Sequence, residues 1–457
     1  MSRLVVVSNR VALPKESRAG GLAVALRAAL AEHGGMWFGW SGRRARGHSG
    51  ELHEQRDGDI RYLTLDLSQA DYDAYYNGFA NRTLWPLLHF RLDLVDYTRE
   101  TYAGYRRVNE LFAEKLAPEL HAEDIVWIHD YHLIPLAQRL RERGVGNRIG
   151  FFLHVPMPSS DLLGALPEHG ELFAALSSYD LVGFQTQRDL ERFQDYVRLH
   201  GGGRIVETGL METAQGRRFR AGAFPIGIDA AIIARQAVGA MRKPTVRRLQ
   251  DSLTGRRLAI GVDRLDYSKG LPERFRAFER HLERHPDQTG LLTFLQIAPP
   301  SRSEVPEYQA LRRKLEALSG HINGRHAVPD WTPVRYVNRN FAHDVLTGFY
   351  RLADLALVTP MRDGMNLVAK EYVASQDPEN PGVLLLSRFA GASYELTEAV
   401  KVNPYDVDGV ADAIAAACAM PLAERRERWR ASMDRIERYD IHAWRRDYLA
   451  NLEQANR

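Results

Sequence analysis

The chain has 457 residues, a length that suits two or three domains with full hydrophobic cores. It is 45% hydrophobic and 26% charged with a formal net charge of +3, which is typical of a globular protein and indicates neither a nucleic-acid nor a membrane partner. Its one cysteine, Cys418, excludes an internal disulfide and a cysteine-based metal site. There is no signal-peptide pattern and no apolar run near the roughly 18 residues of a membrane span, so we expect a cytoplasmic location.

The N-terminal segment predicts a strand, a loop with two glycines and a helix. Residues 4–7 (L-V-V-V) have the β-branched pattern of a buried parallel strand, and Arg10 follows its end. Gly20 and Gly21 precede an amphipathic helix expected at 22–33. The order resembles a phosphate-binding unit, but the spacing is not G-x-G-x-x-G, so this segment alone decides little.

An aromatic-rich segment lies at 72–85, after strands expected at 36–40 and 61–65. It contains Tyr76 and Trp85 among polar residues. Two interpretations are open. The rings pack a core or a lid, or they form a platform for a sugar ring.

Two further strands carry polar residues at their ends. The run 125–130 (I-V-W-I-H-D) ends in Asp130, and the run 149–153 (I-G-F-F-L) is followed by His154. Because ligands of open α/β sheets bind at the carboxyl ends of strands, Asp130 lies where chemistry is expected. His154 is either a structural residue held in place or a site residue, and the pattern does not decide between the two.

The alternation of strands and helices predicts an α/β fold with doubly wound parallel sheets. The pattern pauses near 224–229, and we expect the domain boundary close to 229. A second series of strands is expected at 258–262, 291–297, 334–337, 355–358 and 383–386. Helices are expected at 421–456.

The loop 263–270 (D-R-L-D-Y-S-K-G) follows the first strand of this second series. Arg264 and Lys269 project from this one loop, which suits a diphosphate. Because the chain has 54 Arg and only 7 Lys, the lysine is the more informative of the two; the alternative is a surface loop. Arg302 follows the next strand and repeats the arrangement.

The stretch 359–371 (T-P-M-R-D-G-M-N-L-V-A-K-E) predicts a strand exit, a polar turn around Asp363 and a helix from Asn366. A helix that starts after a strand offers N–H groups and a positive dipole end, which suits a phosphate. Glu371 lies one turn after Leu367 on the same helix face, where it would accept hydrogen bonds from sugar hydroxyls. The alternative is an ordinary βα loop whose charges face water.

Several chemistries do not fit the sequence. There is no G-x-x-x-x-G-K-[ST] loop, which excludes P-loop nucleotide chemistry, and no H-E-x-x-H or cysteine spacing for a metal. The D-x-D pairs at 57/59, 71/73 and 406/408 do not follow a clear apolar strand, so metal-dependent sugar transfer fits poorly. We therefore expect no metal and no cofactor.

Seven stretches across the chain form a specific set: S-N-R with A-G-G, Y-Y-N-G-F-A-N-R-T-L-W-P, W-I-H-D-Y-H-L, G-F-F-L-H-V-P, R-L-D-Y-S-K-G-L-P-E-R, A-P-P-S-R and P-M-R-D-G-M-N-L-V-A-K-E. Together they resemble the trehalose-6-phosphate synthases, retaining glycosyltransferases of the GT-B architecture. The resemblance covers nearly the whole chain. It implies two Rossmann-like doubly wound domains facing across a cleft, with an acceptor domain at 1–228, a nucleotide-sugar domain at 229–439, and a C-terminal helix at about 440–457 packing back on the first.

The resemblance also implies which residues form the site. The nucleotide-glucose donor is expected at Gly20, Gly21, Arg264, Lys269, Phe341, Gly364, Met365, Asn366, Leu367, Val368 and Glu371. The glucose 6-phosphate acceptor is expected at Arg10, Tyr76, Trp85, Asp130 and Arg302. His154 and Asp363 are expected at the transferred glucose, and Arg264 and Lys269 are counted with them as catalytic. We also expect a separate trehalose-6-phosphate phosphatase to act downstream, and a homo-oligomer, either a dimer or a tetramer.

The mechanism that we expect follows from charge. Breaking the bond between glucose and diphosphate develops negative charge on the leaving phosphate, which Arg264, Lys269 and the helix start before Leu367 would stabilise without a metal. Retention, implied by the resemblance, favours front-face attack in which the leaving phosphate takes the acceptor's proton. His154 would then orient the sugar donor instead of acting as a base.

Other functions remain open at this point. The nucleotide is expected to be UDP, but the residues also allow GDP or ADP. An enzyme of the same fold would act on another phosphorylated acceptor such as glycerol 3-phosphate, and a catalytically silent sugar-phosphate sensor is a third interpretation. The intact Arg264, Lys269, Asp363 and Glu371 disfavour the silent protein, which would be free to lose them.

Overall fold

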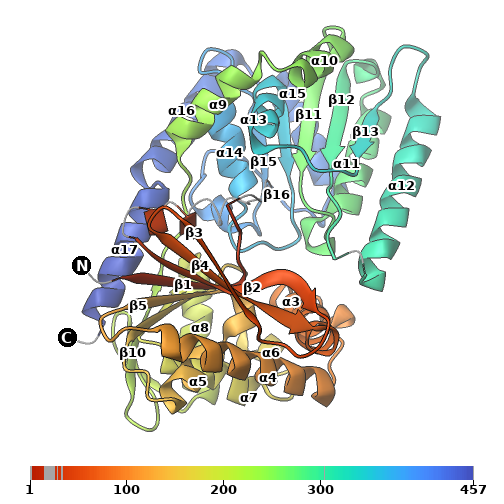
Figure 1. Ribbon diagram of the computed structural model, residues 1–457. Helices are drawn as coiled ribbons and strands as arrows, with labels where there is room; N and C mark the ends of the chain where they lie inside the picture. The colour runs from red at the N-terminus through yellow and green to blue at the C-terminus, as the bar shows by residue number, and fades with distance from the viewer. Residues whose placement is uncertain (1–2, 15–25, 28, 32–33, 303, 456–457) are drawn as a thin grey trace. The chain divides into compact units, whose positions relative to one another are not determined.

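The computed structural model describes residues 3–14, 26–27, 29–31, 34–302 and 304–455. The chain divides into two compact units (Figure 1): a first unit of Met1–Pro225 with Ala443–Arg457, and a second unit of Ile226–His442. These breaks lie within a few residues of the boundaries expected at 228/229 and near 440. The helix expected at 22–33 lies partly outside the described residues, and residues 26–27 and 29–31 of it are helical.

The first unit contains a 10-stranded sheet in the order β3-β4-β2-β1-β5-β6-β7-β10-β9-β8. Its central strands pair in parallel, and antiparallel pairs occur at the edges, where β3 pairs with β4 and β8–β10 form a meander. The strand order reverses between β1 and β5, which makes this the topological switch point of the sheet. The strands are β1 (Leu4–Arg10), β2 (Gly35–Ala45), β3 (Leu52–Asp57), β4 (Ile60–Ser68), β5 (Ile125–His129), β6 (Arg148–Phe152), β7 (Leu181–Phe184), β8 (Arg204–Glu207), β9 (Leu210–Glu212) and β10 (Arg218–Ala223).

The aromatic-rich segment forms a π-helix, η1 (Tyr72–Leu84), that packs against α4 (Arg99–Leu116). Glycines permit this close packing: a Cβ atom on Gly78 would lie 2.6 Å from the Thr101 side chain, and one on Gly104 would lie 2.4 Å from the Ala74 side chain. The sequence did not predict a π-helix, which is rare and is frequently found at functional sites. The remaining helices of the first unit are α2 (Gln69–Asp71), α3 (Trp85–Leu88), η2 (Leu92–Leu94), η3 (Ala117–Glu119), η4 (Tyr131–Leu133), α5 (Leu136–Glu142), α6 (Ser160–Leu163), α7 (His169–Ala174), η5 (Ala175–Ser178) and α8 (Gln187–His200).

The C-terminal helix, α17 (Ile441–Gln454), lies beside the sheet of the first unit (Figure 1). Its Tyr448 contacts the strands. The ring of Tyr448 stacks on Trp127 at 4.7 Å, and its hydroxyl donates to the backbone oxygen of Phe151 at 2.9 Å. Two strand glycines make room for it. A Cβ atom on Gly150 would lie 2.5 Å from the tyrosine oxygen, and one on Gly183 would lie 2.7 Å from its ring. A larger residue in place of Gly150 or Gly183 would therefore displace Tyr448, and α17 with it.

The second unit contains a six-stranded sheet in the order β13-β12-β11-β14-β15-β16, with every pair parallel. Numbered within the unit this is the order 3-2-1-4-5-6 of dinucleotide-binding folds, and its switch point lies between β11 and β14. The fold class expected from the sequence, two Rossmann-like doubly wound α/β domains, is confirmed. The strands are β11 (Arg257–Val262), β12 (Leu292–Ile297), β13 (Val334–Val337), β14 (Leu355–Val358), β15 (Val383–Ser387) and β16 (Val400–Val402).

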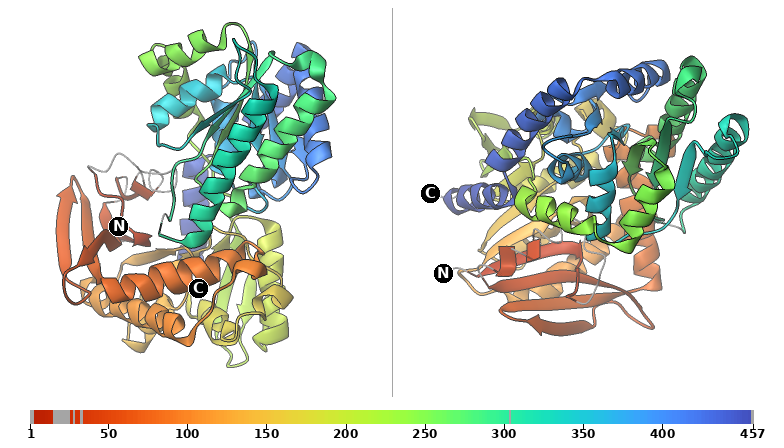
Figure 2. Two further views of the ribbon diagram at one scale, coloured as in Figure 1. Left: turned by 90° about the vertical axis from the view of Figure 1, so that its right-hand side faces the viewer. Right: turned by 90° about the horizontal axis from the view of Figure 1, so that it is seen from above.

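Helices cover this second sheet in layers. Helix α11 packs against α12, beside it in Figure 2, and against α15; their apolar faces form one core with the strands. Helix α9 packs against α13 and α14. In the described part of the chain, no helix is long and apolar enough to cross a membrane. The helices are α9 (Ala230–Ala240), α10 (Pro244–Leu253), η6 (Tyr267–Lys269), α11 (Leu271–Arg284), η7 (Pro286–Gln288), α12 (Pro306–His326), α13 (His343–Leu352), α14 (Leu367–Ser375), η8 (Gly391–Tyr394), α15 (Val407–Ala419) and α16 (Leu422–Arg438).

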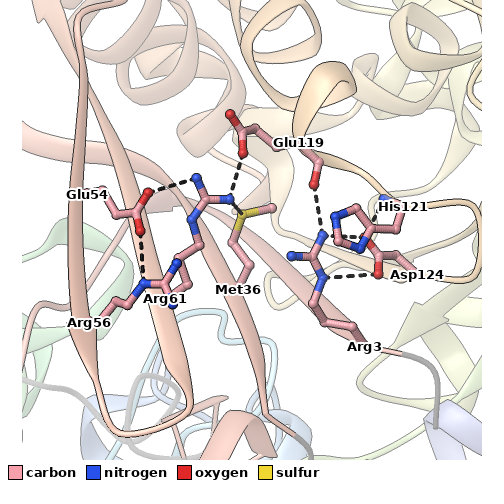
Figure 3. A network of polar contacts seen from close by, with 8 residues as sticks. All are labelled: Arg3, Met36, Glu54, Arg56, Arg61, Glu119, His121 and Asp124. Carbon is pink, nitrogen blue, oxygen red and sulfur yellow. Dashed lines mark hydrogen bonds and ion pairs between the residues drawn. The ribbon is translucent and has the colours of Figure 1, made fainter.

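A network of ion pairs joins the amino ends of β1 and β5 in the first unit (Figure 3). Arg3 precedes β1, and its Nε and Nη2 atoms donate to the carboxylate of Asp124 at 3.1 and 2.6 Å. The backbone N–H of His121 donates to the same carboxylate at 2.8 Å. Arg61 of β4 pairs in a similar way with Glu54 and Glu119. Because ligands bind at the carboxyl ends of strands, this network lies at the opposite edge from the expected site and holds the sheet together.

Candidate active site

In the second unit, Lys269 and Asp363 meet at the switch point between β11 and β14. Lys269 ends η6, which follows β11, and its Nζ atom donates to Oδ2 of Asp363 in the turn after β14. The two side chains are only 12% and 15% exposed. Asn366 donates to the same oxygen at 3.0 Å. A cation, a carboxylate and the start of α14 therefore lie together where a doubly wound sheet binds its ligand.

The turn that carries Asp363 is hydrogen-bonded to the loop after β15. The backbone N–H of Asp363 donates to the oxygen of Phe389 at 3.1 Å, and the N–H of Gly391 donates to the oxygen of Asp363 at 3.2 Å. The approach leaves no room for a side chain, because a Cβ atom on Gly391 would lie 1.8 Å from the backbone oxygen of Gly364. The position of Asp363 is thus set by backbone packing.

Asn366, and not Gly364, supplies the left-handed backbone conformation of this turn, with φ of 76°. Asparagine is one of the few residues with a side chain that visits this region readily. Asn366 is 8% exposed and Met365 is 3% exposed, so the turn is mostly buried. Leu367 then begins α14, where the first N–H groups of the helix have no partner within the helix itself.

Glu371 lies one turn into α14, is 8% exposed, and faces a histidine that the sequence analysis did not identify. Nε2 of His343 approaches Oε1 of Glu371 at 3.5 Å, and this hydrogen bond raises the pKa of His343. Phe341 lies two residues before α13 and is half-buried, with the guanidinium of Arg339 4.9 Å from its ring centre. Val368, also on α14, is half-buried.

Arg302 is buried in an ion pair, whereas Arg264 is exposed. Nη1 of Arg302 donates to Oδ2 of Asp266 at 2.9 Å and to the hydroxyl oxygen of Tyr308 at 2.5 Å. Only 6% of the Arg302 side chain is exposed, and its backbone has φ of 48°. The two arginines therefore differ in setting, although both follow strand ends of the same sheet.

Arg274 of α11, the last residue of the R-L-D-Y-S-K-G-L-P-E-R stretch, supports these loops from inside. Its guanidinium is fully buried and donates to Asp263 at 2.8 Å, to Gln296 at 2.9 Å and to Thr359 at 2.9 Å. These three partners lie at or near the carboxyl ends of β11, β12 and β14. Burial raises the pKa of Asp263, and the charge of Arg274 opposes that rise. The guanidinium of Arg274 thus links the carboxyl ends of three strands by hydrogen bonds.

In the first unit, Asp130 follows β5 at the switch point and has an unusual backbone. Its φ of 75° and ψ of 166° lie in a region that is otherwise almost restricted to glycine. Its N–H donates to the oxygen of Phe152 at 2.8 Å, and its Oδ1 accepts from the N–H of His154 at 3.2 Å. Such strain persists where the surroundings enforce it, which is common at functional sites.

His154 is a buried histidine in a chain of hydrogen bonds. Its Nε2 lies 3.0 Å from Nδ1 of His129, and its Nδ1 lies 3.3 Å from the amide nitrogen of Gln185. If the amide N–H of Gln185 donates, the proton of His154 lies on Nε2 and points to His129. Burial lowers the pKa of His154 to about 3, and burial also lowers that of His129. His154 is therefore a poor proton acceptor at neutral pH.

Arg10, the last residue of β1, is exposed and extends over Gly42, where a Cβ atom would lie 2.8 Å from its Nε. Tyr76 is half-buried, and its ring stacks on His132 at 5.9 Å. Trp85 is 5% exposed and lies 4.0 Å from the ring of His89, so most of its surface packs in the interior. The burial of Trp85 agrees with the interpretation that the aromatic residues pack a core. Tyr76 is only half-buried, so a platform for a sugar ring stays a prediction for this residue. Gly20 and Gly21 lie outside the described residues.

Among the described residues, the structure brings Asp130 and His154 together at the switch point of the first unit, and Lys269, Asp363 and Asn366 together at that of the second. The residues that sequence reasoning missed are the partners of the predicted ones: His129, Gln185, Asp266, Arg274, Tyr308 and His343. His129, Asp266 and Arg274 lie inside the stretches that carry the resemblance. Their membership of these stretches was the signal that could have identified them, although the motifs assign no substrate contact to them. Among the described residues, no group of three or more His, Cys, Asp or Glu side chains is arranged to hold a metal ion.

The fold and these clusters define an α/β protein with two Rossmann-like units, a class that binds nucleotides and phosphorylated sugars at strand ends. The sequence profile of glycosyltransferase family 20 matches residues 3–454. The chain belongs to this family, as the resemblance predicted.

Relatives of known activity are similar over their full length. A trehalose-6-phosphate synthase of Sinorhizobium fredii is 51% identical over 457 residues, which cover 99% of this chain and 98% of the relative. The structure of a UDP-forming α,α-trehalose-phosphate synthase from Burkholderia xenovorans in complex with glucose-6-phosphate is 50% identical, with a TM-score of 0.96 over 99% of this chain and 100% of that chain. An E. coli structure bound with UDP-2-fluoro glucose is 48% identical, with a TM-score of 0.95 over 99% of both chains.

Proposed function

We propose that this chain is a retaining glucosyltransferase that transfers glucose from UDP-glucose to glucose 6-phosphate, giving trehalose 6-phosphate and UDP. The observation that carries the proposal is the match, at about half identity over the full length, to synthases whose structures hold glucose-6-phosphate and a UDP-glucose analogue. The UDP-forming relatives favour UDP over GDP and ADP. The switch-point clusters support the proposal, because they supply the cations that two phosphorylated substrates need.

The sugar donor is proposed to bind in the second unit. Lys269, Arg264 and the N–H groups at the start of α14 would face its diphosphate, and Glu371 would accept hydrogen bonds from its ribose. The setting of Lys269 supports this, since its ammonium group lies beside Asp363 at the switch point. The remaining proposed contacts to the donor are Gly20, Gly21, Phe341, Gly364, Met365, Asn366, Leu367 and Val368.

The acceptor is proposed to bind through Arg10, Tyr76, Trp85, Asp130 and Arg302. Arg10 and Arg302 would contact its phosphate, and Asp130 would accept hydrogen bonds from its hydroxyls. The strained backbone of Asp130 supports this role, because such a conformation is costly and is kept where it places a functional carboxylate. The half-buried ring of Tyr76 suits contact with one face of the sugar.

In the proposed reaction the bond between C1 of glucose and the diphosphate oxygen breaks, and the acceptor hydroxyl forms a new bond to C1 from the same face. The acceptor's proton passes to the departing phosphate oxygen. Lys269, Arg264 and the start of α14 stabilise the negative charge that grows there. The low pKa of His154 supports a role in orienting glucose instead of a role as base. Asp363 is proposed to contact the same sugar.

Side-chain cations and a helix start would do the work that a metal does in other glycosyl transfers. Activity should therefore survive exhaustive treatment with a metal chelator. A complete loss that a divalent ion restores would refute this part of the proposal.

The test of the function is a panel of sugar donors and acceptors with purified protein. UDP-glucose, GDP-glucose and ADP-glucose are each mixed with glucose 6-phosphate, glycerol 3-phosphate or glucose, and nucleoside diphosphate release and product anomer are measured. We expect UDP-glucose with glucose 6-phosphate to be the best pair. Preference for glycerol 3-phosphate would indicate the alternative acceptor, and no release with any pair would indicate a silent sensor.

Two further expectations belong to this proposal. Because the product carries a phosphate, release of free trehalose requires a separate phosphatase acting downstream. We also propose that the chain works as a dimer or tetramer in the cytoplasm, which light scattering and cell fractionation would test.

A further inference from the structure

Asp266 is a fully buried carboxylate in the loop between β11 and η6, and no sequence motif assigns it a role. A buried charge of this kind is costly unless it is hydrogen-bonded and paired. Asp266 makes hydrogen bonds through both of its carboxylate oxygens, and the two oxygens face different parts of the candidate site.

The Oδ1 atom of Asp266 shapes the loop that carries Lys269. It accepts from the backbone N–H of Ser268 at 3.0 Å and from the Ser268 hydroxyl at 2.9 Å, which caps η6. The backbone oxygen of Asp266 accepts from the N–H of Lys269 at 3.1 Å. The direction in which Lys269 leaves the loop therefore depends on Asp266.

The Oδ2 atom of Asp266 holds Arg302. It accepts from Nη1 of Arg302 at 2.9 Å and from the hydroxyl of Tyr308 at 3.2 Å. Burial raises the pKa of Tyr308, so this hydroxyl stays protonated and continues to donate. Arg302 has a left-handed backbone with φ of 48°, which a residue with a side chain keeps only where its surroundings hold it.

We propose that Asp266 is a positioning residue that couples the sugar-donor and acceptor phosphate sites, because one carboxylate sets both the Lys269 loop and the guanidinium of Arg302. The inference rests on the proposed function, in which Lys269 faces the donor diphosphate and Arg302 faces the acceptor phosphate. It adds a residue that contacts neither substrate and acts through both cations. A change at Asp266 should then alter turnover and acceptor binding together.

The informative substitution is Asp266→Asn, because it keeps the shape of the side chain. The amide oxygen can still accept from Ser268, whereas the amide NH₂ would face the N–H donors of Arg302 in place of an acceptor. The variant therefore releases Arg302 while it keeps most of the loop contacts. Arg302→Ala and the double variant Asp266→Asn/Arg302→Ala complete a cycle that separates direct from indirect effects.

We expect Asp266→Asn to raise the KM for glucose 6-phosphate about tenfold or more, because the guanidinium of Arg302 loses its acceptor. It should also lower kcat, because a neutral amide oxygen holds Ser268, and with it the loop that carries Lys269, more weakly than the carboxylate does. In the double variant, the KM for glucose 6-phosphate should stay within about threefold of that of Arg302→Ala alone, because Asp266 acts on the acceptor through Arg302. The loss of kcat from the Asp266 change should persist in the double variant.

Asp124→Asn is the matched control (Figure 3). Asp124 is 3% exposed and, like Asp266, accepts from one arginine and from a nearby backbone N–H. It lies at the amino ends of the strands of the first unit, away from the candidate site. A general effect of removing a buried carboxylate should lower the unfolding temperature of both variants, but only Asp266→Asn should change the KM for glucose 6-phosphate.

If Asp266→Asn does not fold, Tyr308→Phe tests the same contact. It removes one hydroxyl beside Oδ2 and Arg302 and keeps the ring. It should raise the KM for glucose 6-phosphate several-fold and leave the KM for UDP-glucose unchanged. An unchanged acceptor KM in this variant would overturn the inference.

The outcomes distinguish the inference from the proposed function. If Arg302→Ala raises the acceptor KM but Asp266→Asn leaves it within about threefold of wild type, the coupling role is wrong and the acceptor site stands. If the double variant shows the product of the two single effects, Asp266 does not act through Arg302, and the inference is also wrong. If Arg302→Ala changes no acceptor constant, the assignment of the acceptor site itself fails, and the inference falls with it.

Discussion

The Nζ atom of Lys269 donates a hydrogen bond to the carboxylate of Asp363, a residue 94 positions further along the chain. The two come from loops on either side of the switch point, where adjacent strands send their connections to opposite faces of the sheet. Both side chains are mostly buried, so water and salt screen this pair less than they screen a surface pair. Asp363 holds the ammonium group at the place where we propose that the diphosphate leaves.

Lys269→Ala and Arg264→Ala should each lower kcat by about 10²–10³, because each removes a cation from the charge that grows in the transition state. Initial rates at saturating substrates and far-UV circular dichroism would measure activity and folding. Arg276→Ala is the control, since Arg276 is an exposed residue of α11 paired with Glu273. Near-wild-type kcat in both site variants would contradict the leaving-group assignment.

Arg10→Ala should raise the KM for glucose 6-phosphate about ten- to a hundredfold and leave the KM for UDP-glucose nearly unchanged. A charge-assisted contact to phosphate contributes roughly 1.5–3 kcal/mol, which gives this range. The comparison is Arg56→Ala on the edge strand β3, whose side chain is exposed and paired with Glu54. A large effect on UDP-glucose with no effect on glucose 6-phosphate would reverse the assignment.

The backbone of Asp130 predicts a difference between two substitutions at this position. Asp130→Gly and Asp130→Ala both remove the carboxylate, and both should abolish most activity. Glycine adopts the observed φ of 75° without strain, so Asp130→Gly should be more stable than Asp130→Ala by roughly 1–3 kcal/mol. Urea unfolding of the two variants would measure this difference, and equal stabilities would show that the backbone is not strained.

The buried His154 predicts how stability depends on pH. Its pKa is about 3 in the folded protein and near 6.5 in the unfolded chain, so between these values the unfolded chain binds a proton that the folded protein does not. The free energy of unfolding therefore decreases as pH falls below about 6.5, by at most roughly 1.4 kcal/mol per pH unit. His154→Gln should lose less stability than wild type between pH 7 and pH 5.

Urea unfolding at several pH values would measure this effect. His48→Gln, a change at an exposed histidine, should follow the wild-type curve. If His154→Gln also parallels wild type, the imidazole is not held neutral by burial.

Local sequence patterns were sufficient for the framework of this protein. Apolar runs of β-branched residues predicted the parallel strands, because strands covered on both faces have little choice of residue. Topology brings the carboxyl ends of parallel strands to one edge, so polar residues at strand ends predicted ligand sites there. These residues are Arg10, Asp130, His154, Arg264, Lys269 and Asp363. The motif set also predicted the family, which the match over residues 3–454 confirms.

The tertiary structure alone decided the conformation and the partners of these residues. The π-helix at Tyr72–Leu84, the left-handed backbone at Asn366 and the buried pair of Asp266 with Arg302 carry no local signal. Each depends on contacts between segments far apart in the chain, such as Gly78 against Thr101 or Gly391 against Gly364. Spacing in sequence shows which residue types are available at a strand end, whereas burial and long-range packing determine their charge state, direction and coupling.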